Sequence, residues 1–157
     1  MDAATAPTHD LARIEQSART RRRWLALVIA VATGALLLVA AWLVPSTDGH
    51  GTHTQLGLPQ CGWVVGMGIP CPSCGMTTSF AHAANGNLLG SIRAQPAGSV
   101  LALGTAMVFV LSVWVLATGS AIGSFWFDRI DKWFFIFGGI LVLGAWVYKI
   151  FVFKGVL

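Results

Sequence analysis

Charged residues are scarce in this chain, and their scarcity excludes most classes of soluble protein. Only 10% of the 157 residues are Asp, Glu, Lys or Arg, whereas a typical soluble domain has about 25%. Between Gly49 and Ile92 there is no charged residue. Hydrophobic residues make up 55% of the chain, which excludes a disordered protein and a basic nucleic-acid-binding domain. The composition indicates an integral membrane protein.

Signatures of catalysis are also missing. The chain has no Gly-x-Ser-x-Gly, His-Glu-x-x-His, P-loop or Rossmann pattern. No pair of carboxylates lies within an apolar run, so the usual relay of a proton-coupled transporter is missing as well. The sequence leaves enzymatic activity open and favours a protein that is not an enzyme.

Three apolar runs, near residues 24–44, 97–118 and 133–153, predict the fold class. Each can cross a hydrocarbon core of about 30 Å as a helix. Five of the ten Lys and Arg residues precede the first run, within residues 1–23, and such clusters mark the cytoplasmic side. We therefore predict an all-α, polytopic membrane protein. Residues 1–23 form a mobile, basic cytoplasmic tail, and residues 24–157 form one membrane domain with three transmembrane helices.

The lipid bilayer is the first partner that this architecture implies, and other membrane proteins are the second. Small residues that favour close helix contact recur in the second and third runs. Lys149, near the end of the third run, is expected to extend its side chain to the lipid headgroups. The small residues are Gly98, Ala102 and Ala106, and then Gly138, Gly139 and Gly144.

Residues 58–95 are hydrophobic but do not read as a fourth span. Prolines and glycines interrupt them, and polar side chains such as Asn85 and Asn87 would be costly in lipid. We expect a re-entrant segment buried among the helices, or an interfacial segment on the outer side. Pro96 then opens the next span, because a proline at the first helical position loses no hydrogen bond.

All three cysteines of the chain lie within this segment, at positions 61, 71 and 74. We expect Pro72 to begin a helix that runs to about Ala84. Cys71 would then border the helix N-terminus, where a thiol has a lowered pKa, and Cys74 would follow one turn later. The Cys-x2-Cys spacing suits a redox-active dithiol or half of a thiolate metal site; inert thiols and a structural disulfide remain alternatives.

A complete metal site would need further ligands. Cys61 could be the third ligand, and His50 or His53, in the preceding loop, could be the fourth, with zinc or copper as the ion. In a straight helix His82 would lie about 12 Å from Cys74, too far to share an ion. The simpler alternatives are that His50 and His53 are exposed loop residues and that His82 packs against another helix. Packing is also the simpler role of three methionines that could join a copper(I) site, Met67, Met76 and Met107.

The pattern around these cysteines resembles a family of small bacterial membrane proteins grouped as domain of unknown function 2752. An upstream cysteine is followed by Gly-x-Pro-Cys-Pro-x-Cys-Gly-x-Thr and by a proline that opens the next span. The resemblance covers residues 58–100, with Thr78 in place of the family's Arg and Gln95 in place of its Asn. It implies location in the bacterial cytoplasmic membrane and an architecture more than an activity. The matching positions are Cys61, Pro70, Cys71, Pro72, Cys74, Gly75, Thr77 and Pro96.

Three functions are consistent with these observations. The first is a structural, interaction or accessory module of the membrane. The second is a membrane thiol-disulfide oxidoreductase that uses Cys71 and Cys74. The third is a metal-binding membrane protein that uses the same two residues.

Overall fold

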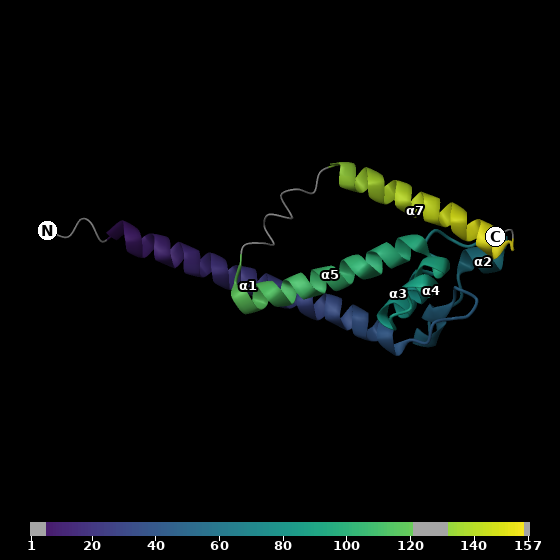
Figure 1. The fold of residues 1–157 in the computed structure, drawn as a ribbon, viewed down its shortest axis with the longest axis horizontal. Coiled ribbons are helices and arrows are strands. Elements are labelled where there is room, and N and C mark those ends of the chain that lie inside the picture. Colours follow the sequence, from purple (N-terminus) through teal and green to yellow (C-terminus); the bar gives the residue numbers. More distant parts are fainter. Residues whose placement is uncertain (1–5, 121–131, 156–157) are drawn as a thin grey trace.

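The fold is helical throughout the part of the chain that the structure, a computed structural model, describes: residues 6–120 and 132–155. Figure 1 labels the helices, and the predicted all-α class is confirmed. Three helices are long: α1 (Ala6–Trp42), α5 (Pro96–Thr118) and α7 (Lys132–Phe153). Four elements are short: η1 (Thr52–Leu56), α2 (Gly62–Met67), α3 (Met76–Ala84) and α4 (Leu88–Ala94).

All three long helices contain a segment that is long and apolar enough to cross a membrane. α5 runs antiparallel beside α1, and α7 runs antiparallel to α5 (Figure 1). The last turn of α7 therefore returns to the end of the bundle where α1 ends and α5 begins. This arrangement is the one that the three predicted spans require, and the protein is a multi-pass membrane protein.

α1 begins far earlier than the first predicted span. The helix is continuous over 37 residues, which corresponds to about 55 Å and exceeds the thickness of the hydrocarbon core. The prediction of a mobile tail is therefore wrong for the described residues from Ala6 onward. After Pro7, which lies in the first turn, no proline or glycine interrupts the sequence until Gly34. Good helix formers such as Leu, Ala, Arg and Gln fill most of this stretch.

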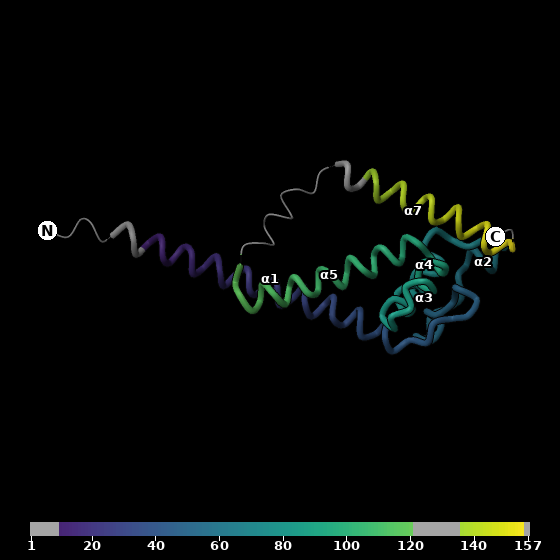
Figure 2. Tube along the Cα trace, in the orientation of Figure 1, coloured from purple at the N-terminus to yellow at the C-terminus, as the bar shows by residue number. Residues whose placement is uncertain are grey.

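Residues 76–94 form a helical hairpin, here called the cap, at the end of the bundle. Figure 2 shows α3 and α4 beside the C-terminal end of α1 and the N-terminal end of α5. Gly86, with φ +77°, allows the sharp turn between them. The Asn87 side chain accepts a hydrogen bond from the Gly90 backbone N–H at 2.8 Å and so caps α4. The predicted re-entrant or interfacial segment is thus a hairpin too short to span the bilayer.

Three buried serines tie the cap to α5. The hydroxyl of Ser79 in α3 lies 2.8 Å from that of Ser91 in α4 and 3.1 Å from that of Ser99 in α5. The hydroxyls of Ser91 and Ser99 are 2.8 Å apart. Ser91 also donates to the Ser79 carbonyl. This closed network satisfies polar groups that would be costly without partners.

Small residues have different roles in α5 and α7. A Cβ on Gly98 would lie 2.9 Å from the Ser79 side chain, and Ala102 is buried, so the predicted close contact of α5 is confirmed. In contrast, a Cβ on Gly138, Gly139 or Gly144 would have no described atom within 4 Å. The expected helix contact at these glycines is therefore wrong within the described chain, because α7 diverges from α5 at its N-terminal end (Figure 1).

Candidate functional site: a three-cysteine cluster

The three cysteines converge although Cys61 lies in a separate element. Cys61 immediately precedes α2, whereas Cys71 and Cys74 lie on the turn that leads into α3. The three Sγ atoms all lie within 4.8 Å of one another. We call this group the three-cysteine cluster. Cys61 and Cys71 are partly exposed, and Cys74 is buried.

The turn that holds Cys71 and Cys74 is not part of a helix. α3 begins at Met76, not at Pro72, so the expected position of Cys71 at a helix N-terminus is wrong. A hydrogen bond from the Cys74 N–H to the Cys71 carbonyl (2.9 Å) closes the turn. The next residue, Gly75, has a φ of +89°. This left-handed conformation ends the turn before α3 can begin.

Gly75 is required for a second reason, which is lack of space. A Cβ at this position would lie 2.7 Å from the Gly49 carbonyl oxygen and 2.9 Å from that of Ala94. The backbone next to Cys74 thus packs directly against the loop of Gly49 and the C-terminal end of α4. Gly75 thus combines a left-handed backbone angle with a close approach to neighbouring backbone.

The C-terminal turns of α7 hold the cysteine-bearing loop from the opposite side. Trp146 donates a hydrogen bond from Nε1 to the Pro70 carbonyl at 2.9 Å. Its ring makes an edge contact with Trp63 of α2 at 6.2 Å between centroids. Gln95 holds the same loop from the start of α5, because its Nε2 donates to the Pro72 carbonyl at 3.1 Å. Pro70 itself is buried.

Lys149 turns inward, so the expectation that it extends to the headgroups is wrong. Its side chain is 2% exposed. Nζ donates hydrogen bonds to the Gly49 carbonyl (2.8 Å) and the Ala94 carbonyl (2.9 Å), the two groups that border Gly75. Two well-placed carbonyls thus replace water around the ammonium.

The environments of the thiols differ. Burial raises the pKa of the Cys74 thiol to about 11, and the charges of the other two thiols act in the same direction. The Lys149 ammonium acts against this increase. At Cys61, burial also acts to raise the pKa, but hydrogen bonds from the Val64 backbone and the Cys71 side chain lower it to about 7. Cys61 is therefore the more thiolate-like of these two residues at neutral pH.

The histidines do not join the cluster. His50 is 2.8 Å from the Asp48 carbonyl through Nδ1, and its ring contacts Phe153. His53 is 3.1 Å from the Pro59 carbonyl through Nε2. Among the described residues, the group of possible metal ligands contains the three thiols alone. The fourth-ligand role predicted for His50 or His53 has no support in this arrangement.

The remaining motif positions lie around the turn. Thr77 is partly exposed in the first turn of α3. Thr78 is fully buried, and its hydroxyl lies 2.8 Å from that of Thr52 in η1. Pro96 follows the extended residue Gln95 and begins α5, as predicted.

Sequence reasoning did not predict that Gln95, Trp146 and Lys149 hold the cysteine-bearing loop or the segments beside it, nor that serines tie the cap to α5. One signal was present in α7. Trp146, Lys149 and Phe153 have spacings of three and four residues, so they share one helix face. This spacing places Lys149 on the same side of α7 as Trp146, whose Nε1 donates to the Pro70 carbonyl.

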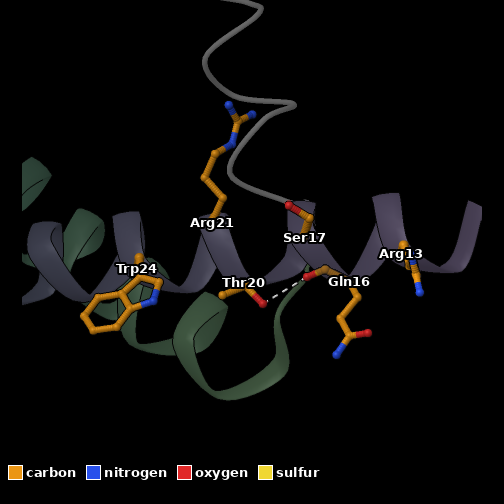
Figure 3. A pocket seen from close by; sticks show the side chains of 6 residues that line it. All are labelled: Arg13, Gln16, Ser17, Thr20, Arg21 and Trp24. Atoms are coloured by element: carbon orange, nitrogen blue, oxygen red, sulfur yellow. Dashed lines mark hydrogen bonds between the residues drawn. The ribbon is translucent and has the colours of Figure 1, made fainter. Parts of the chain in front are cut away.

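The described part of the chain also has two surface hollows away from the three-cysteine cluster. An apolar groove of about 760 Å³ lies between α1 and α5 beneath the end of α3, lined mainly by alanine and leucine. A second hollow lies on the N-terminal part of α1 (Figure 3). There the side chains of Arg21 and Trp24 point away from each other and converge on no common point. Neither hollow gathers groups for catalysis.

The fold and the cluster define a class: a multi-pass helical membrane protein with a three-cysteine turn at one end of the bundle. Residues 61–109 match the family described as Protein of unknown function (DUF2752). This match supports the resemblance that the cysteine pattern indicated. The match covers the cysteines, the cap and the first half of α5. No curated protein and no solved structure matches the chain.

Proposed function

We propose that this protein is a metal-binding membrane module, in which Cys61, Cys71 and Cys74 hold one thiophilic ion, zinc or copper(I). The observation that carries the proposal is the convergence of all three thiols within 4.8 Å. An ion with metal–sulfur bonds of about 2.3 Å holds its sulfurs about 4 Å apart. Small side-chain rotations at the partly exposed Cys61 and Cys71 would close the difference.

Such an ion would act as a structural clamp. It would join the start of α2 to the turn before α3, two segments that are separated in the sequence by α2 and by the short loop Gly68-Ile69-Pro70. Binding of a divalent ion converts three thiols into thiolates and releases three protons: M²⁺ + 3 RSH → [M(SR)₃]⁻ + 3 H⁺. An interaction or accessory role in the membrane is compatible with this clamp.

A thiol-disulfide oxidoreductase is the second candidate, since any two of the three thiols could form a disulfide. Three convergent sulfurs favour the metal site, because an ion can use all three of them, whereas a disulfide uses two and leaves no second pair to carry the electrons onward. The chain also has no further cysteine to receive or pass on the electrons. The exposure of Cys61 and its lowered pKa are what support the redox alternative.

The proposed location is the bacterial cytoplasmic membrane with the N-terminus in the cytoplasm. The arginines that precede the first apolar segment support this orientation. The three-cysteine cluster lies between the starts of α2 and α3, at the opposite end of the bundle from the N-terminal part of α1, which carries these arginines (Figure 1). In this orientation it faces the outer side of the membrane.

The experiment measures metal content and free thiols of the full-length protein, purified in detergent without chelator. We expect about one zinc or copper ion per chain, and loss of the ion when any one cysteine is changed to serine. The double variant His50→Ala, His53→Ala is the matched control and should keep the ion. Three free thiols that bind no added metal would refute the proposal. A single disulfide that cycles without metal would establish the redox alternative.

A further inference from the structure

Lys149 is the one buried cation in the described part of the chain, and its position next to the cysteines needs an explanation. The side chain comes from α7, yet it ends between the loop that carries Gly49 and the C-terminal residue of α4, Ala94. Nζ would be 3.2 Å from a Cβ on Gly75, the residue directly after Cys74. The ammonium therefore lies against the backbone of the cysteine turn.

Carboxylates do not explain this position. Between Asp48 and Asp128 the sequence has no Asp or Glu. Asp48 adjoins Gly49, but its side chain is exposed and solvated. The hydrogen bonds of Nζ go to two neutral carbonyls, which orient an ammonium without neutralising its charge. The nearby groups that can become negative are the thiols of the three-cysteine cluster.

Charge arithmetic then links Lys149 to the bound ion. Three thiolates with a divalent ion carry a net charge of −1, and one ammonium makes the group neutral. Three thiolates with copper(I) carry −2, and the same ammonium leaves −1. A neutral group is the easier one to hold in a poorly solvated site, because an uncompensated buried charge is costly.

On the basis of the proposed function, we infer that Lys149 is the counter-charge of the thiolate–metal complex and that a divalent ion, Zn²⁺, makes the complete group neutral. Lys149 is a positioning residue and does not ligate the ion. Its two carbonyl contacts keep the charge beside Cys74, and Gly75 supplies the space for it.

A purely structural role for Lys149 predicts a different result from the charge role. Loss of a structural tie would weaken the binding of both ions equally. Loss of the counter-charge would weaken copper(I) binding more, because the copper complex retains twice the negative charge of the zinc complex. The ratio of the two losses is therefore the decisive quantity.

The test uses the full-length protein in detergent at pH 6, where the thiols are mostly protonated before metal is added. The affinities for Zn²⁺ and Cu⁺ are measured by competition with chromophoric chelators. Lys149→Met removes the charge and the donors, and Lys149→Gln removes the charge but keeps a donor. Trp146→Phe removes a neighbouring hydrogen bond of α7 without a change in charge. We expect both Lys149 variants to lose about tenfold in Zn²⁺ affinity. The loss in Cu⁺ affinity should be the square of that factor, about a hundredfold, because the Coulomb energy doubles when the charge of the complex doubles. Trp146→Phe should weaken both ions by the same small factor.

Wild-type protein that binds neither ion would refute the proposed metal site itself. Wild-type binding with unchanged affinities in Lys149→Met and Lys149→Gln would refute only the counter-charge. So would equal losses for the two ions, or retention by the glutamine variant alone. If both Lys149 variants fail to fold while Trp146→Phe folds, Lys149 is a structural tie and the counter-charge role is wrong.

Discussion

Gly75→Ala tests whether the cysteine turn is packed as tightly as the structure shows. Two costs are expected. A φ of +89° costs a residue with a side chain about 1–2 kcal/mol. The new methyl group would also lie 2.7 Å from one carbonyl oxygen and 2.9 Å from another, and such overpacking costs about 1–3 kcal/mol. The expected total destabilisation is about 2–5 kcal/mol.

Gly51→Ala is the matched control for this substitution. Gly51 has nearly the same backbone angle, φ +85°, but a Cβ there has no atom within 4 Å. The control therefore bears the backbone cost without the steric cost. The assay is thermal unfolding of the two variants in the same detergent, in which 1 kcal/mol corresponds to about 2–4 °C for a chain of this size.

The difference between the two variants isolates the contact of residue 75 with the carbonyls of Gly49 and Ala94. We expect Gly75→Ala to unfold at a lower temperature than Gly51→Ala. A larger residue, as in Gly75→Leu against Gly51→Leu, should widen the gap and lower the folded yield. Equal unfolding temperatures for both pairs would show that the turn is not packed against these two segments. The burial of Lys149 beside the turn would then be wrong.

Four further predictions concern the thiols, the serine network and the orientation in the membrane. Cys61 should react with a small alkylating reagent at lower pH than Cys74, in variants that keep one cysteine each, because their pKa values are about 7 and about 11; the same pH profile for both would contradict the burial of Cys74. Metal affinity should rise at least tenfold for each pH unit from 7 to 9, since the Cys74 proton must leave, and a pH-independent affinity would exclude this thiol as a ligand. Ser91→Ala should destabilise the protein by about 1–3 kcal/mol, because it leaves buried partners without hydrogen bonds; Thr105→Ala, at an exposed hydroxyl, is its control, and equal effects would argue against the serine network. Cysteines introduced at Thr5 and Gly51 should be labelled from opposite sides of the membrane, and labelling of both from one side would refute the orientation.

The cysteine site could be predicted only in part. The spacing of Cys71 and Cys74 indicated paired thiols, and the third cysteine was a plausible partner. The helix expected to begin at Pro72 does not form there, because Gly75 adopts a left-handed conformation that local propensity does not reveal. The histidines illustrate the reverse error, since loop residues that could reach an ion are held by carbonyl groups of their own loop.

The order of apolar and charged residues is enough to predict the class of protein and the number of spans. Long uncharged runs can satisfy their backbone groups in lipid only as helices, so hydropathy and length decide this level of structure without knowledge of contacts. The tertiary structure alone decided which side chains meet. In the sequence, Lys149 is an ordinary lysine near the end of a span. It is buried because α7 returns to the cap, where the carbonyls of Gly49 and Ala94 take the place of water around Nζ. Contacts between residues up to 100 positions apart depend on how helices pack, and no local pattern encodes that packing.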